Sequence, residues 1–288
     1  MAVSVLTLFH WRFAKVSFGA FWHSRRRLLD HGQNLAPARW FLAGFDSRQA
    51  PAVRILSRGL ASRGERKMCG RFVDPNLRNT EVDMSQIKLD PFGARFNVKP
   101  TETVVILAKS PLIAMEARWG LIPSWFGGDS PKAWKAATFN ARIEDAREKP
   151  AFRQVWRHGR CLVPVGGFYE WSGPRGARQP HFFHPAGNEA NLYLAGLASR
   201  WRDLLTCTIL TREATGAMAG LHHRMPVILN ADERDAWLGG SDDVAPLGTG
   251  VKLACHPVAP FGLQDDGPEL IEAINLQGGT QSFVRCPS

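Results

Sequence analysis

Cys69 carries groups that could react covalently with an aldehyde, because it directly follows Met68 in the sequence. If translation starts at Met68, the small side chain after it favours removal of the initiator methionine, and Cys69 then has a free α-amine. An amine with a pKa of about 8 and a thiol with a pKa of about 8.5 are both partly nucleophilic near neutral pH. The amine forms an imine, and the thiol closes a five-membered thiazolidine in an intramolecular step. An internal cysteine has an amide nitrogen and is usually a small buried residue.

Glu170 lies in an aromatic segment, between Phe168-Tyr169 and Trp171. A carboxylate among aromatic rings is costly unless it is paired or protonated, and such burial raises its pKa into a range useful for acid–base catalysis. The sequence therefore favours Glu170 as a proton-transfer residue, with a salt-bridged structural glutamate as the alternative.

His222 and His223 precede Arg224 in a turn between Gly220 and Pro226. A histidine beside an arginine in such a turn is a candidate for proton transfer or phosphate contact. Metal binding is less favoured, because adjacent histidines point apart on an extended chain and no acidic residue lies near.

Two further polar positions could contact a substrate. Asn140 could orient a reacting group through its amide, and Arg142 could bind a phosphate, although Asn140 is equally suited to cap a helix. Trp119 and Trp125 lie close to Arg118, so they predict either a stacking surface for unpaired bases or two core tryptophans.

The elements that must position these residues are mostly strands. Apolar alternation and β-branched runs predict eight strands, at Thr103–Ala108, Leu112–Arg118, Cys161–Val165, His181–His184, Leu192–Ala198, Leu205–Leu210, Pro226–Leu229 and Lys252–His256. Helices are predicted at Ala151–Arg157, after a capping box at Asn230 and Glu233, and at Leu270–Ile274. Because strands outnumber helices without alternating with them, we expect an α+β fold with a mostly antiparallel, curved, pseudo-barrel-like sheet.

Composition excludes several classes of protein. The chain has 288 residues, 44% hydrophobic and 22% charged, as expected for a globular protein of one or two domains. It contains no apolar run of about 18 residues, so we expect no membrane span. Five scattered cysteines without a CxxC pair argue against a disulfide framework or a zinc ribbon and fit a reducing compartment. The absence of Walker, GxGxxG, HExxH and GxSxG motifs weakens nucleotide-binding, zinc-protease and serine-esterase interpretations.

The net charge of +10 is concentrated at the N-terminus. Residues 1–67 hold 12 Lys and Arg against 3 Asp and Glu, whereas residues 68–288 hold 24 against 23. The segment 1–67 could be an organelle transit peptide or a basic arm for nucleic acid. We favour a third interpretation, in which 1–67 is an extension upstream of the true start or is removed, and 68–288 is a single domain.

The order of the motifs along residues 68–275 closely resembles the SOS response-associated peptidase (SRAP) family of abasic-site crosslinking proteins. The motifs are Met68-Cys69-Gly70-Arg71-Phe72, Arg95-Phe96-Asn97-Val98-Lys99-Pro100, Trp119-Gly120-Leu121-Ile122-Pro123, Asn140-Ala141-Arg142, Phe168-Tyr169-Glu170-Trp171, His222-His223-Arg224-Met225-Pro226 and His256-Pro257-Val258.

The resemblance implies binding to single-stranded DNA, particularly at junctions with duplex, and reaction with abasic sites. The family's N-terminal cysteine, which forms a thiazolidine with the opened deoxyribose, corresponds to Cys69. Its asparagine, glutamate and histidine correspond to Asn140, Glu170 and His222, with roles in positioning, sugar ring opening and proton transfer. The positions that contact phosphates and bases correspond to Arg71, Arg142, Arg224 and Trp119. The family is also credited with a peptidase activity.

Two other functions remain open from the residues. One is a cysteine hydrolase that uses Cys69, His222 and Glu170 and needs no free amine. The other is a non-covalent binder of single strands that uses Trp119 and the arginines. We expect a monomer without cofactor, metal or membrane contact, located in the cytoplasm and on the nucleoid when bound to DNA.

Overall fold

The computed structural model describes residues 70–275, apart from residues 94, 109–110, 175 and 244–246. The described residues form one compact unit. The described strands are β1 (Phe72–Val73), β2 (Thr103–Ala108), β3 (Ile113–Trp119), β4 (Asn140–Arg142), β5 (Arg160–Val165), β6 (Gly167–Ser172), β7 (Gln179–Pro185), β8 (Leu192–Trp201), β9 (Leu204–Glu213), β10 (Arg224–Pro226) and β11 (Leu253–Pro257).

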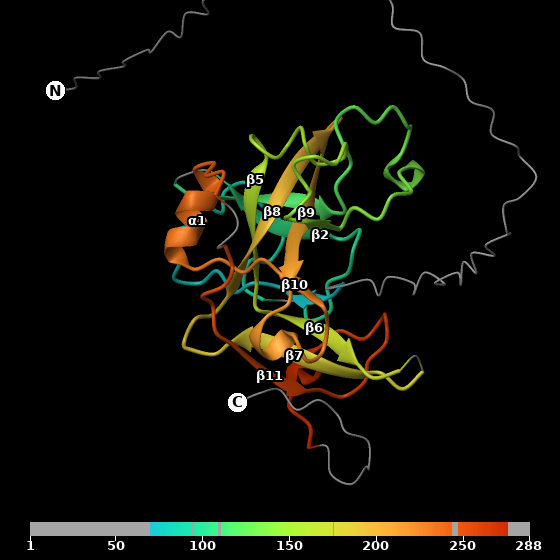
Figure 1. Cartoon of the computed structure of the whole chain (residues 1–288), viewed down its shortest axis with the longest axis vertical. Coiled ribbons are helices and arrows are strands. Elements are labelled where there is room, and N and C mark those ends of the chain that lie inside the picture. The colour runs from blue at the N-terminus through green and yellow to red at the C-terminus, as the bar shows by residue number, and fades with distance from the viewer. Residues whose placement is uncertain (1–69, 94, 109–110, 175, 244–246, 276–288) are drawn as a thin grey trace, which may run out of the picture. The chain divides into compact units, whose positions relative to one another are not determined.

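The strands form two sheets (Figure 1). The smaller sheet has the order β1-β6-β7-β11, and the larger follows the path β10-β9-β3-β2-β5-β8, with β4 added beside β9. All pairs are antiparallel except β3–β9 and β4–β9. Strand β8 pairs with both β5 and β9, so the larger sheet curls back on itself. The curl is not a regular closed barrel, because β2 meets β5 through the single pair Leu107–Leu162. This confirms the expected α+β fold with a mostly antiparallel curved sheet.

Helical structure is sparse among the described residues. Helix α1 (Ala231–Leu238) begins at the predicted capping box, in which Asn230 and Glu233 each accept a hydrogen bond from the other's backbone N–H. The predicted helix at Ala151–Arg157 is instead a series of turns, although Trp156 N–H donates to the Phe152 carbonyl as in a helix. Three short 3₁₀ helices complete the fold: η1 (Pro131–Ala133), η2 (Gly216–Met218) and η3 (Pro268–Ile271), the last overlapping the helix predicted at 270–274.

Both faces of the curled sheet are buried. Alternate residues of a strand point to opposite faces, and β2 accordingly sends Val104 and Ile106 into one apolar cluster and Val105 and Leu107 into another. We call the first the central cluster, because it also contains residues of the smaller sheet. Its members include Phe72, Val104, Ile106, Trp119, Val163, Phe168, Phe183, Ile209, Met218 and Leu221. The second, which we call the outer cluster, includes Val105, Leu107, Ala141, Trp156, Leu210 and Trp237.

The cysteines depart in one respect from the sequence expectation. Cys161 and Cys207 are free and buried, as expected, but Cys255 is disulfide-bonded. Burial raises the pKa of Cys161, and raises that of Cys207 to about 12, so both remain protonated thiols near neutral pH. Since the thiolate is the nucleophile, neither residue is suited to nucleophilic catalysis.

Candidate active site

Glu170 lies on strand β6, on the face that looks toward the central cluster. Tyr169 points to the outer side of the smaller sheet, whereas Phe168 belongs to the central cluster, so alternation directs Glu170 the same way as Phe168. The Glu170 side chain is 4% exposed. The sequence did not predict β6, and the structure therefore supplies the orientation of this carboxyl group.

Asn140 reaches the same cluster from the larger sheet. It begins strand β4 rather than capping a helix, and it pairs in register with Ile209 of the central cluster. Ala141 turns the opposite way, into the outer cluster. Asn140 and Glu170 therefore project from two different sheets toward one central cluster.

His222 follows Leu221, a member of the central cluster, in the turn before β10. Its ring is buried, whereas that of His223 is exposed, and the two ring centroids lie 4.4 Å apart. The backbone N–H of Arg224 donates to Nδ1 of His222 over 3.1 Å. The same Nδ1 lies 3.3 Å from the Arg224 carbonyl oxygen, so the backbone of Arg224 fixes the position of the His222 ring.

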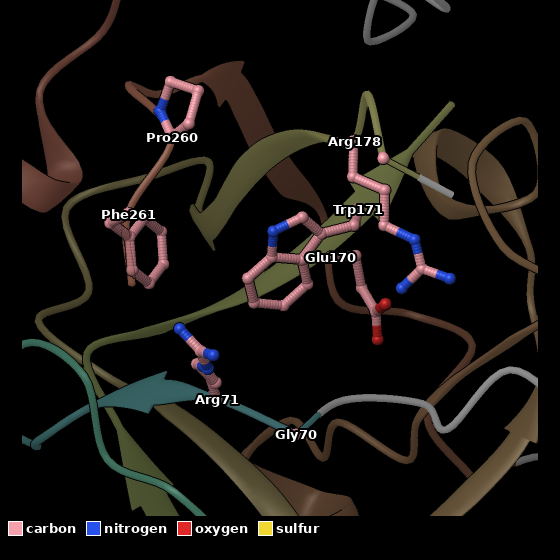
Figure 2. A pocket seen from close by; sticks show the side chains of 8 residues that line it. Gly70, Arg71, Glu170, Trp171, Arg178, Pro260 and Phe261 are labelled. Atoms are coloured by element: carbon pink, nitrogen blue, oxygen red, sulfur yellow. The ribbon is translucent and has the colours of Figure 1, made fainter. Parts of the chain in front are cut away.

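A cavity of about 600 Å³ contains Glu170 (Figure 2). It is lined by Gly70, Arg71, Glu170, Trp171, Gly176, Arg178, Pro260 and Phe261. Gly70 is the residue that follows Cys69 in the chain, while Cys69 itself lies outside the described residues. We call this cavity the Glu170 pocket.

Arg71 forms part of the Glu170 pocket between two aromatic rings. Its guanidinium carbon is 5.3 Å from the ring centroids of both Trp171 and Phe261, and Nη1 donates to the Gly262 carbonyl over 2.9 Å. Burial lowers the pKa of Arg71, although the negative charge of Asp265 acts to raise it. An arginine has more N–H donors than these contacts use, so Arg71 is suited to hold an anion at the pocket.

Asn140 and Arg142 line a second cavity, of about 510 Å³, together with exposed aromatic residues. Trp125 is 55% exposed there and packs edge-on against Trp134, with centroids 5.8 Å apart. Trp119, in contrast, is fully buried between Phe72 and Phe139. The assignment of Trp119 to base contact is therefore corrected, because its ring belongs to the core and the exposed indole is that of Trp125.

Arg224 is already engaged within the protein. Its guanidinium makes a bidentate pair with Glu144 at 2.6 and 2.7 Å, and Nη2 also donates to the Thr211 carbonyl over 2.7 Å. Burial acts to raise the pKa of Glu144, but hydrogen bonds and charge from Arg224 outweigh it and lower the pKa. A phosphate at Arg224 would have to compete with this carboxylate.

Sequence reasoning missed Arg178, His181 and Phe261. Arg178 lines the Glu170 pocket, and His181 lies directly opposite Glu170 in the β6–β7 pair. Phe261 is brought to the pocket by the loop after β11. A hairpin register could have suggested His181, but no local signal indicates Phe261.

The described residues give no sign of a metal site or a membrane span. Within them, no group of three or more His, Cys, Asp or Glu side chains is placed to hold a metal ion. No helix in the same part of the chain is long and apolar enough to cross a membrane.

The fold and the pockets define a two-sheet α+β protein with a buried acid, an imidazole and arginines beside aromatic walls. The family model described as SOS response associated peptidase (SRAP) matches residues 68–260, more than half of the chain. The chain belongs to the SRAP family, as its motif order indicated.

Curated relatives are about one-third identical to this chain over the aligned residues. The abasic site processing protein HMCES of Gallus gallus is 33% identical in an alignment of 201 residues that covers 58% of this chain and 59% of that protein. YoaM of Bacillus subtilis, also named an abasic site processing protein, is 34% identical in an alignment of 184 residues that covers 59% of this chain and 79% of that protein. YobE of the same organism, with the same description, is 32% identical in an alignment of 232 residues that covers 72% of this chain and 100% of that protein.

Two solved structures share the fold. A protein from Bordetella bronchiseptica has a TM-score of 0.57 and 24% identity, covering 67% of this chain and 100% of that one. A protein from Bacteroides thetaiotaomicron has a TM-score of 0.54 and 24% identity, covering 64% and 87%. At this identity they support the fold alone.

Proposed function

We propose that this protein processes abasic sites in single-stranded DNA by forming a covalent thiazolidine crosslink through Cys69. The observation that carries the proposal is that Gly70, joined to Cys69 by one peptide bond, lines the same pocket as the buried carboxyl group of Glu170. The relatives named above are abasic site processing proteins, which supports the same substrate.

The first step assigned to the pocket is opening of the sugar. The deoxyribose of an abasic site is mostly a closed hemiacetal, and opening it requires a proton on the ring oxygen and loss of the hydroxyl proton. Glu170, buried on the cluster-facing side of β6, is suited to move these protons. The product is the free aldehyde.

The second step joins the aldehyde to the protein. The Cys69 amine adds to the aldehyde carbon, and His222 moves a proton from the amine nitrogen to the departing hydroxyl, which leaves as water. The thiol then adds across the resulting imine, so the whole crosslink releases one water. Asn140 is assigned to hold the amine and the sugar, since it projects toward the same cluster as Glu170.

DNA would be held by a local patch, because residues 68–288 carry 24 Lys and Arg against 23 Asp and Glu. Arg71 in the Glu170 pocket and Arg142 in the second cavity are the arginines assigned to phosphates. Each phosphate contact on a single strand contributes about −0.7 to the slope of log affinity against log salt concentration.

The segment 1–67 bears directly on this chemistry. A peptide bond on the Cys69 nitrogen would make it an amide, which cannot form an imine. The proposal therefore includes exposure of the Cys69 amine, either by translation from Met68 or by removal of the preceding residues.

Adduct formation tests the proposal. The mature protein, with Cys69 at its N-terminus, should form a heat-stable adduct with an oligonucleotide that carries one abasic site. The Cys69→Ser and Cys69→Ala variants should form none, and neither should a protein that retains residues 1–68. An adduct that survives Cys69→Ala would overturn the proposal.

A second measurement separates this chemistry from a cysteine hydrolase. Acetylation of the α-amine should abolish the adduct while the Cys69 thiol stays reactive toward a thiol reagent. A hydrolase that uses only the thiol would keep its activity after the same treatment.

A further inference from the structure

Trp171 and Phe261 form an aromatic wall at one end of the Glu170 pocket (Figure 2). Their ring centroids lie 5.8 Å apart at an interplanar angle of 49°. Phe261 also packs edge-on against Tyr169 at 4.8 Å, so its ring is supported from the side. Two aromatic rings beside the reacting end of a pocket offer a surface for another planar group.

The loop that carries Phe261 is fixed by side chains from a distant part of the chain. The buried Asn97 amide donates to the carbonyls of Gly262 and Asp265 at 3.1 and 2.6 Å. Lys99 donates to the Leu263 carbonyl over 2.8 Å, and Arg71 donates to Gly262. Since the loop is held before any ligand arrives, little conformational freedom is lost when a ligand packs on Phe261.

The charges around the aromatic wall indicate the chemistry of the ligand. The Arg71 guanidinium lies over both rings, 5.3 Å from each centroid, and Arg178 stands toward the Glu170 end of the pocket (Figure 2). A group that offers a flat π-face and an adjacent negative charge satisfies both features, and a nucleotide offers both. The volume of about 600 Å³ lies within the range of small-molecule sites.

We propose that Phe261, together with Trp171, binds the nucleobase next to the abasic site by stacking, with the intervening phosphate at Arg71. The proposal rests on the proposed function, because it takes the sugar at Glu170 to be the abasic one. It adds a consequence: the pocket requires an intact base beside the lesion and disfavours runs of consecutive abasic sites.

Equilibrium binding to an analogue that cannot crosslink tests this inference. A tetrahydrofuran residue replaces the abasic sugar and lacks the aldehyde, so binding of the mature protein stays reversible. The neighbouring nucleotide on the 5′ or the 3′ side is either normal or also tetrahydrofuran. Removing the stacked base should weaken binding of the wild-type protein about tenfold on one side of the lesion.

Removing the Phe261 ring should weaken binding as much as removing the stacked base does. Both changes together should weaken binding little more than either change alone. Phe261→Ala should bind the oligonucleotide with normal neighbours about tenfold more weakly than the wild type does. When the stacked base is also removed, the affinity of Phe261→Ala should fall by less than about a further twofold. Leu263→Ala is the matched control, since Leu263 is on the same loop, 60% exposed and not part of the pocket wall. This control should bind like the wild type.

Phe261→Leu keeps the apolar volume and removes the aromatic face, so it should lose affinity about tenfold even if Phe261→Ala fails to fold. The inference is overturned if the affinity losses from Phe261 substitution and from base removal are fully additive in free energy on both sides of the lesion. Unchanged affinity in Phe261→Leu also overturns it. Failure of the proposed function is seen separately, as the absence of a covalent adduct between the wild type and a natural abasic site.

Discussion

Glu170 and His181 lie directly opposite each other in the antiparallel pair of β6 and β7, and both side chains are buried. Directly paired residues point to the same face, with Cβ atoms about 4.5–5.5 Å apart. Nδ1 of His181 lies 3.1 Å from the Gln179 carbonyl oxygen, which can only accept a hydrogen bond. Nδ1 of His181 therefore donates to this carbonyl, and the imidazole lies on the same face of the sheet as the candidate acid.

His181 should make the folded state sensitive to acid. Burial lowers the pKa of His181, the charge of His256 acts in the same direction, and the Gln179 carbonyl opposes both. The unfolded state then binds more protons than the folded state below about pH 6.5, so the free energy of unfolding should fall as the pH decreases through that range.

Urea unfolding of the wild type and His181→Phe at pH 7.5 and 5.5 measures this effect. The wild type should lose more stability between the two pH values than the variant. The His181→Phe variant should still lose some stability between pH 7.5 and 5.5, because burial also lowers the pKa of His184. Equal losses in the two proteins would contradict the account of His181.

Trp119 and Trp125 should respond to substitution in opposite ways. Trp119 is fully buried, so Trp119→Ala should lower the free energy of unfolding by about 3–5 kcal/mol. Trp125 is 55% exposed, so Trp125→Ala should change stability by less than about 0.5 kcal/mol. The same variant should weaken binding to single-stranded DNA, as measured by fluorescence anisotropy. A stable Trp119→Ala that loses DNA affinity would restore the original assignment of Trp119.

Glu144 should restrain DNA binding through its ion pair with Arg224. Glu144→Gln removes the competing charge while Arg224 keeps its hydrogen bond to Thr211, so affinity for single-stranded DNA should rise. The salt dependence should steepen by about 0.7 in the slope of log affinity against log salt concentration. The exposed Glu148 is the matched control, and Glu148→Gln removes the same charge nearby. An equal gain in both variants would show that Arg224 gains no phosphate contact.

The two adjacent histidines should differ in their effect on crosslinking. His222 is buried beside the central cluster with its ring held by the Arg224 backbone, whereas His223 is exposed. His222→Ala should slow adduct formation by about 100-fold, the lower end for loss of a general acid. His223→Ala should have little effect. The reverse order in a single-turnover time course would mean that the proton-transfer residue is His223.

The strands that carry the sheet were predictable, because their apolar residues alternate. Strand β2 has the predicted bounds Thr103–Ala108, and β5 starts one residue before the prediction. The helix at Asn230 was predictable from its capping box, since both hydrogen bonds are local. Strand β6 was not predicted, because Gly167 and the aromatic residues of the strand give no clear alternation and its orientation depends on β1 and β7.

The site was predictable only in part. The positions of Asn140, Glu170 and His222 in apolar or aromatic segments drew attention to them, but their common direction depends on pairing between distant strands. The residues around Trp119 left a core position and a stacking surface both open, and its assignment to base contact came from the resemblance, whereas the structure places its ring in the core. Phe261 reaches the pocket through contacts with Asn97 and Arg71, which lie more than 160 residues earlier.

Intact mass spectrometry of the mature protein after reaction with an oligonucleotide that carries one abasic site tests the central claim most directly. The account predicts a new species with the mass of protein plus oligonucleotide minus one water, with Cys69 as the first residue, and no such species in Cys69→Ser. The same adduct mass on a protein whose Cys69 nitrogen still bears a peptide bond would contradict it.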